Sequence, residues 1–406
     1  AQHRVTSAVP AASHNRPVDP APRPTLDPSA RLLPAEDASE TWTLFVELES
    51  GHRITQRFLL SNQGPGKHNA VAVGHFVEPG RAPYRYVNGR RRARWKLSDD
   101  RLFFDIGASH LDLHRPKGEL RITKDDIEIR LFFDFRDQAP AAAIPPEQLP
   151  PDYHVEVLAL GADTRGSVLA PWMTAPLETR GRTWLVHTWS ESDEQAHLDR
   201  RVEFYAHDGA RAFYAVHFSR GRDWQSGWSM LGGPADQVIE SAINVPARWT
   251  EYPAGAGSPP PGLYPTPSGF AVDQTPFAGS ITLTDDWLRF DPLEVIPQPF
   301  RWFIRRKMRP QEVWADAKIG VSLFAASEEP LLPRADASGP VAHEDSRWTG
   351  WIERTESSTP SRDSPADRGA EAGAQSSSQR ETDDRTATGS VKGVSSITFL
   401  NPRSRR

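Results

Sequence analysis

The amino-acid sequence predicts an all-β protein built from antiparallel barrels or sandwiches, with few short helices. Three observations support this prediction. Many short segments rich in β-branched and aromatic residues follow one another at close spacing, separated by turn residues. Proline accounts for 37 of the 406 residues, and such a content is incompatible with long helices over much of the chain. Helical periodicity is scarce, and its best examples, 233–242 and 310–316, are short.

The first two strands are predicted at 41–49 and 53–60, because apolar and polar residues alternate on both sides of the turn at Ser50-Gly51. The other predicted strands are 95–97, 101–106, 119–122, 127–135, 155–160, 183–189, 202–206, 212–218, 280–283, 288–290, 317–324 and 348–354. Asp-Asp pairs begin at residues 99, 125 and 285, each between two predicted strands. We therefore interpret them as turn residues and not as catalytic carboxylates. Residues 97–105 also resemble 283–291, which indicates either a duplication or a shared hairpin pattern.

Composition divides the chain into four parts. Residues 1–38 are rich in proline without hydrophobic periodicity and are predicted to be a disordered arm. A first β domain is predicted at 39–245, and a second at 246–354 together with 391–402. Between the two parts of the second domain, 355–390 contains no large apolar residue and is predicted to be a disordered insertion. We expect 348–354 to pair with 394–400 across it.

Charge, cysteine content and motifs exclude several functions. The formal net charge is −5 and no basic field extends along the chain, so we expect no nucleic-acid partner. The chain has no cysteine, which excludes disulfides and thiolate metal sites. His110-x-Asp112-x-His114 alternates with leucines as a half-exposed strand does, so no metal and no cofactor are predicted. Because the first residue is Ala1, we expect a mature chain that is periplasmic or secreted, although a trimmed chain would start in the same way.

The segment 170–189 carries the candidate site. On its second strand Leu185, His187 and Trp189 share one face, so His187 is either a core histidine or a polar group in a ligand pocket. The following strands add Glu203 and Tyr205, and we predict His187, Glu203 and Tyr205 as an acid–base set. The residues predicted to line an apolar ligand site are Trp172, Trp184, Trp189, Phe204, Phe213 and His217.

The stretch from Phe300 to Arg309 combines five cations with apolar residues. It is predicted either to contact an anionic membrane surface peripherally or to form a strand whose arginine stems cover apolar neighbours.

Three stretches resemble a known superfamily. They are Phe58–Gly66, Trp95–Phe135 and Pro171-Trp172 followed by Trp184–Trp189. They resemble the tandem lipocalin-like AttH-like proteins, which include carotenoid hydratases of the hydroxyneurosporene-synthase type. Over about residues 40–350, the resemblance implies two lipocalin-like β domains side by side, with apolar ligands bound in or between them. Val186 stands where such proteins often have an acid before the histidine, a departure from their pattern.

Three functions follow as predictions. The first is binding of a hydrophobic small molecule, such as an isoprenoid or lipid, in or between the two domains. The second is an enzyme of the hydratase or cyclase type acting on an isoprenoid or polyketide-like substrate. The third is a carbohydrate-binding or carbohydrate-processing protein, because exposed tryptophans also stack on sugars. The sequence leaves open whether the protein is catalytic, and also leaves open its ligand and its oligomeric state.

Overall fold

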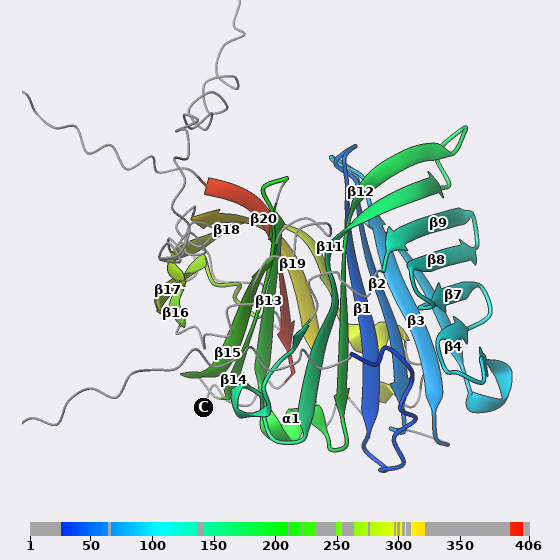
Figure 1. Ribbon diagram of the computed structural model, residues 1–406, viewed down its shortest axis with the longest axis horizontal. Coiled ribbons are helices and arrows are strands. Elements are labelled where there is room, and N and C mark those ends of the chain that lie inside the picture. The colour runs from blue at the N-terminus through cyan, green and yellow to red at the C-terminus, as the bar shows by residue number, and fades with distance from the viewer. Residues whose placement is uncertain are drawn as a thin grey trace, which may run out of the picture. The chain divides into compact units, whose positions relative to one another are not determined.

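The computed structural model describes residues 26–63, 66–135, 142–209, 211–220, 223–232, 249–253, 264–274, 277–295, 298, 301–302, 305, 310–320 and 390–400. In these residues strands dominate, and the α-helix α1 (Glu194–His197) is a single turn (Figure 1). All strand pairs are antiparallel and fall into two sheets. The predicted all-β class with two lipocalin-like β domains is confirmed. No helix in the described part of the chain is long and apolar enough to cross a membrane.

The first sheet contains the first twelve strands. Its order is β4-β3-β2-β1-β12-β11-β9-β8-β7-β6-β5, with β10 paired to β11. The strands are β1 (Ser39–Leu48), β2 (Arg53–Ser61), β3 (Asn69–Val77), β4 (Tyr84–Arg90), β5 (Lys96–Leu97), β6 (Phe103–Asp105), β7 (Ser109–Asp112), β8 (Lys117–Lys124), β9 (Ile127–Asp134), β10 (Ala142–Ala143), β11 (Tyr153–Leu169) and β12 (Leu177–Ser190).

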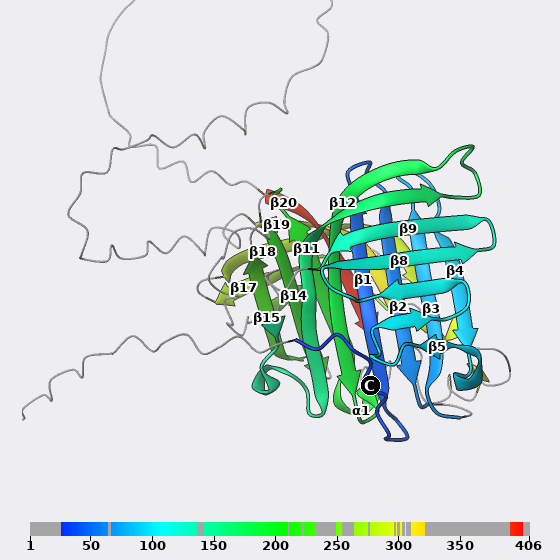
Figure 2. The same ribbon diagram turned by 45° about the vertical axis from the view of Figure 1, so that its right-hand side comes forward.

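This sheet curls over its own apolar face. Figure 2 shows β8 and β9 running across β1 to β3. Leu120 and Ile129 of the former strands belong to the same core cluster as Leu44 and Phe58 of the latter. In β9 the alternation Ile127, Ile129, Leu131 and Phe133 places one side chain in two toward this core, as a half-buried strand requires.

The second sheet contains eight strands in the order β15-β14-β13-β20-β19-β18-β17-β16. The strands are β13 (Arg200–His207), β14 (Ala212–Arg220), β15 (Asp223–Gly232), β16 (Trp249–Tyr252), β17 (Gly269–Gln274), β18 (Phe277–Phe290), β19 (Gln311–Gly320) and β20 (Ser390–Phe399). Its own core includes Phe204 and Phe213 from one half and Phe270 and Ile281 from the other, so this sheet also curls.

A third apolar layer lies where the two sheets pack on each other. Phe45, Trp184 and Val186 of the first sheet join Tyr205, Tyr214 and Trp314 of the second sheet in one buried cluster. The central strands β1 and β12 are therefore buried on both faces, and their burial is nearly continuous over 42–46 and 183–188. This double burial separates the inside of the first sheet from the layer between the sheets.

Several local predictions differ from the structure. The predicted helix at 310–316 is wrong, because 311–320 is strand β19, in which Val313, Ala315, Ala317 and Ile319 are buried. Asp99-Asp100 and Asp125-Asp126 lie in turns as predicted, whereas Asp285-Asp286 lies within β18, where the pairing with β19 shifts register. An extra residue in a strand can thus imitate a turn in the sequence. The other predicted helix, 233–242, lies outside the described residues.

The sheets also bear on the predicted domain limits. Strands β13 to β15, at 200–232, belong to the second sheet, although the prediction grouped them with the first domain. Strand β20 pairs with β13 on one edge and with β19 on the other. Its predicted partner, 348–354, lies outside the described residues, and so does the predicted insertion at 355–390. Of the predicted arm, residues 26–38 are described, and Leu26, Ala30 and Ala38 are buried.

Candidate functional site

The imidazole of His187 is fully buried inside the first sheet. His187 lies on β12, opposite Trp42 of β1 and Glu156 of β11. Its side chain is 0% exposed, and the ring of Trp42 stacks on it at 4.5 Å between centroids and 11° between planes. Because a polar group in a core costs free energy unless it is paired, both ring nitrogens require polar neighbours.

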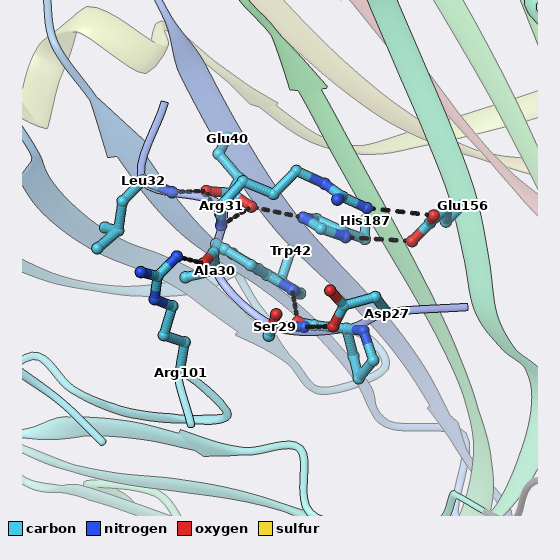
Figure 3. A network of polar contacts seen from close by, with 11 residues as sticks. Asp27, Ser29, Ala30, Arg31, Leu32, Glu40, Trp42, Arg101, Glu156 and His187 are labelled. Atoms are coloured by element: carbon cyan, nitrogen blue, oxygen red, sulfur yellow. Dashed lines mark hydrogen bonds and ion pairs between the residues drawn. The ribbon is translucent and has the colours of Figure 1, made fainter. Parts of the chain in front are cut away.

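Two carboxylates supply these neighbours (Figure 3). Nε2 of His187 is hydrogen-bonded to Oε1 of Glu40 at 2.9 Å. Nδ1 of His187 lies 3.5 Å from Oε2 of Glu156, an ion-pair distance without hydrogen-bond alignment. Both carboxylates are themselves buried, at 2% and 8% exposure. An imidazole between two carboxylates has an acidic group near each ring nitrogen, and it can pass a proton from one side to the other.

The N-terminal segment before β1 covers this cluster. The backbone N–H of Arg31 donates to both carboxylate oxygens of Glu40, at 2.9 and 3.1 Å. The guanidinium of Arg31 lies 3.8 Å above the ring of Trp189 and 3.3 Å from Oε1 of Glu156. The indole N–H of Trp42 donates to the carbonyl of Pro28 at 3.1 Å. The same two carboxylates therefore hold both the histidine and the covering segment.

The structure does not bring the three predicted catalytic residues together. Glu203 and Tyr205 lie on β13 in the second sheet, whereas the side chain of His187 packs against Trp42 in the core of the first sheet. Glu203 accepts a hydrogen bond from the hydroxyl of Tyr214 at 2.9 Å. Tyr205 belongs to the layer between the sheets, and burial raises its pKa. The predicted pairing fails because His187 and these two residues lie on opposite faces of the first sheet.

The predicted ligand-lining residues are also distributed over separate clusters. Trp189 alone among them contacts His187, at 4.9 Å between ring centroids. Trp172 packs beside Phe76 at the outer end of the first sheet, and Trp184 belongs to the layer between the sheets. The other three, Phe204, Phe213 and His217, lie in or against the core of the second sheet. They do not form one cavity.

A cavity does lie between the two sheets. Its volume is about 10 Å³, which is room for about one water molecule, and it is partly open to solvent. The first sheet contributes Thr43, Thr55, Gln56, Arg57, Val73 and His75, and the second contributes Phe290, Glu312 and Trp314. Across it Nη1 of Arg57 lies 2.7 Å from Oε2 of Glu312, and the indole N–H of Trp314 donates to Oε1 of Glu312 at 2.7 Å.

Among the residues that line this cavity, the positive charge of Arg57 is paired with the negative charge of Glu312. Burial opposes ionisation of Glu312, but the Arg57 guanidinium outweighs it and leaves the pKa of Glu312 below its usual value. Burial lowers the pKa of His75 to about 4, so its imidazole is neutral at pH 7. Nε2 of His75 and Oε1 of Gln56 are buried without a hydrogen-bond partner. A single water molecule that donates a hydrogen bond would satisfy the amide oxygen.

Two other predicted features have a described position. His114 forms ion pairs with Asp100 at 2.7 Å and Asp112 at 2.5 Å, and these hydrogen bonds raise its pKa. No group of three or more His, Asp or Glu that could hold a metal is found among the described residues. In the stretch 300–309, only Arg301, Trp302 and Arg305 are described, and Trp302 is 47% exposed. Membrane contact there stays a prediction.

Glu40, Glu156 and Arg31 are the functional candidates that sequence reasoning missed. Each is an isolated charged residue in the sequence, and Arg31 falls in the predicted disordered arm. A weak signal existed for Glu40, because it precedes Trp42 by two residues and so shares its face of the strand. Nothing local indicates that Arg31 folds back onto β12.

Comparison with known proteins supports the fold and no closer relationship. No protein-family model matches the sequence, and no curated protein sequence does. Among solved structures, an AttH-type protein from Nitrosomonas europaea matches with a TM-score of 0.54 and 11% identity, covering 75% of this chain and 94% of that one. The structure of CghA with Sch210972 matches with a TM-score of 0.51 and 11% identity, covering 93% and 94%.

Kievitone hydratase from Nectria haematococca matches more weakly, with a TM-score of 0.47 and 10% identity, covering 93% of this chain and 97% of that one. The matches to the AttH-type protein and to CghA show the fold class: the chain has the tandem lipocalin-like fold of the AttH-like proteins, as the sequence resemblance predicted. At 11% identity they establish the fold alone.

Proposed function

We propose that this protein is an acid–base enzyme of the hydratase type that acts on a hydrophobic small molecule at His187. One observation carries the proposal: a fully buried imidazole with a buried carboxylate at each ring nitrogen. Burying three ionisable groups together costs free energy that an apolar core of the same size would avoid. Such clusters concentrate at sites of proton transfer. The surrounding indoles, Trp42 and Trp189, suit an apolar substrate.

The cluster suits addition of water to a carbon–carbon double bond. A protonated His187 would give its proton to one alkene carbon, and the positive charge that develops on the other carbon would be stabilised by the faces of Trp42 and Trp189. The oxygen of a water molecule then bonds to that carbon and releases a proton to Glu156. Because Glu156 lies 3.5 Å from Nδ1, this proton can return to the ring and restore the starting state. The net reaction consumes one alkene and one water.

The test is incorporation of ¹⁸O-labelled water into isoprenoid and polyketide-like alkenes, followed by mass spectrometry. We expect His187→Gln to lower kcat/KM by about 100-fold or more, because it removes the proton donor. His217→Gln is the matched control, since His217 is an equally buried histidine in the second sheet. Equal rates in His187→Gln and the natural chain would refute the assignment of His187.

A second candidate function is binding of a hydrophobic small molecule without turnover. The related fold of CghA was solved with Sch210972, which supports small-molecule binding in such a scaffold. Native mass spectrometry followed by organic extraction tests this candidate. A co-purifying apolar compound that gains no ¹⁸O from labelled water supports binding without turnover, whereas the absence of any co-purifying compound contradicts it.

The carbohydrate alternative receives less support. Sugar stacking requires exposed aromatic faces, and Trp302 is the one large apolar side chain exposed among the described residues. We therefore do not propose it.

A further inference from the structure

We propose that residues 26–32 form a lid over His187, and that Arg31 is the latch that keeps it closed. This inference builds on the proposed function, because it states how a substrate reaches a histidine with no exposed surface. In the closed form Asp27, Ser29 and Arg31 lie across the cluster, as Figure 3 shows. Leu26 and Ala30 are buried at 7% and 1% exposure in the core of the first sheet.

Arg31 makes more polar and stacking contacts with the strands below it than any other residue of the lid. It makes three of them: its N–H to Glu40, its guanidinium to Glu156, and the stacking on Trp189. Its neighbours are held more lightly. Ala30 N–H donates to the carbonyl of Arg101 at 3.0 Å, and Trp42 donates to Pro28 at 3.1 Å. Trp42, Glu156 and Trp189, in contrast, lie at positions where β1, β11 and β12 are paired with one another.

The segment that follows the lid is anchored separately. The side-chain amide of Asn62 donates to the carbonyls of Leu33 and Ala35 at 2.8 and 2.6 Å, and Lys67 donates to the carbonyl of Pro34 at 2.8 Å. Residues 33–35 are thus tied to the loop after β2 whether the lid is open or closed. A hinge is therefore expected between Arg31 and Leu33.

Leu32 is the residue at that hinge. Its φ is +51°, in the left-handed region that a leucine adopts only at a cost. The contacts of Arg31 on one side and of Asn62 on the other hold it there, together with its own N–H, which donates to Oε2 of Glu40 at 3.3 Å. Loss of the Arg31 contacts lets Leu32 relax to an ordinary conformation, which swings residues 26–31 away from the cluster. Opening then exposes Trp42, Trp189 and His187 together, and these are the groups that the proposed reaction needs.

The absence of cysteine allows a direct test of opening. Ala30→Cys places the only thiol of the chain at a position that is 1% exposed when the lid is closed. The rate of its reaction with a thiol reagent such as dithionitrobenzoate then measures the open fraction. We expect Arg31→Ala to raise this rate by about tenfold or more, because it removes the ion pair and the cation–π contact. Lys67→Ala, which touches only the anchored segment, should leave the rate unchanged.

Two results would contradict the proposal that residues 26–32 form a lid latched by Arg31. In one, the thiol reacts equally fast in the Arg31→Ala variant and in the chain that keeps Arg31, so that Arg31 does not latch the segment. In the other, Arg31→Ala raises hydrogen exchange throughout β1 and β12 together with the thiol rate, which means general loosening of the sheet. Both measurements use protein without substrate. The lid proposal can therefore be refuted even if His187 catalyses hydration, and it can be supported even if no turnover is found.

Discussion

Two buried histidines in this protein show how surroundings decide the chemistry of one residue type. His187 has a carboxylate at each ring nitrogen, so its surroundings can supply and receive protons. His75 hydrogen-bonds through Nδ1 to the hydroxyl of Thr55 at 3.2 Å and has no partner at Nε2. Burial therefore dominates at His75 and lowers its pKa to about 4.

The lowered pKa of His75 predicts a pH dependence of stability. Above pH 6.5 His75 is neutral in both the folded and the unfolded chain, so its contribution to stability is complete. Between pH 6.5 and about 4 the unfolded chain binds the proton first, and stability falls as the pH falls. The full loss is about 3 kcal/mol at about 1.4 kcal/mol per pKa unit.

Urea unfolding at pH 7 and pH 4 measures this loss. Relative to the natural chain, His75→Gln should be less sensitive to the change in pH by about 3 kcal/mol. His52→Gln, a substitution in the loop between β1 and β2, is the control and should keep the full sensitivity. If His75→Gln and the natural chain lose the same stability, His75 is not the titrating group.

At the scale of the element, strand β11 contains a β-bulge that affects how the two sheets pack. Its pairing with β12 shifts register between Val157 and Ala162, and Gly161 in this interval has a φ of +61°. A Cβ at Gly161 would lie 2.4 Å from Cβ of Ala212 on β14. The bulge therefore lets the first sheet approach the second closely enough to form their shared core.

Gly161→Ala is expected to destabilise the protein by about 2–4 kcal/mol, because it combines a disfavoured φ with overpacking against Ala212. Gly209→Ala separates the two effects. Gly209 has a φ of +90° but no atom within 4 Å of the added Cβ, so only about 1 kcal/mol should be lost there. Thermal or urea unfolding of both variants gives the comparison. Equal losses would show that the contact with Ala212 contributes nothing.

At the scale of the whole molecule, the last strand closes the second sheet. β20 lies between β13 and β19, and its pairing with β19 runs from Gln311↔Phe399 to Gly320↔Ser390. Gly320 and Ser390 are therefore direct neighbours across the ladder, although 69 residues separate them in the sequence. Closing such a long connection costs only slightly more entropy than closing a short one.

Replacement of residues 321–389 by a four-residue Asn/Gly turn should therefore preserve the fold, because the two strand ends already meet. We expect the shortened chain to keep its circular dichroism spectrum and to unfold in one transition at an equal or higher temperature. Truncation after residue 388 is the opposite case, since it leaves β13 and β19 without their shared partner. Loss of folding in the shortened chain would contradict the prediction.

The sequence by itself determined the class of the fold and several elements. Two β-rich runs on either side of the turn at Ser50-Gly51 placed the strands at 39–48 and 53–61 to within two residues. Alternation placed Leu185, His187 and Trp189 on one face of a strand. It failed at 311–316 and at Asp285-Asp286, where burial on both faces and a bulge disturb the alternation.

Only the tertiary structure decided what surrounds His187. Its partners, Glu40 and Glu156, come from the two strands that flank β12, and they are 147 and 31 residues away in the sequence. Pairing between distant strands sets which side chains stand opposite one another, and no local pattern encodes that choice. Periodicity shows which face of its own strand a side chain occupies. The register and curl of the sheets decide which distant residues that face meets.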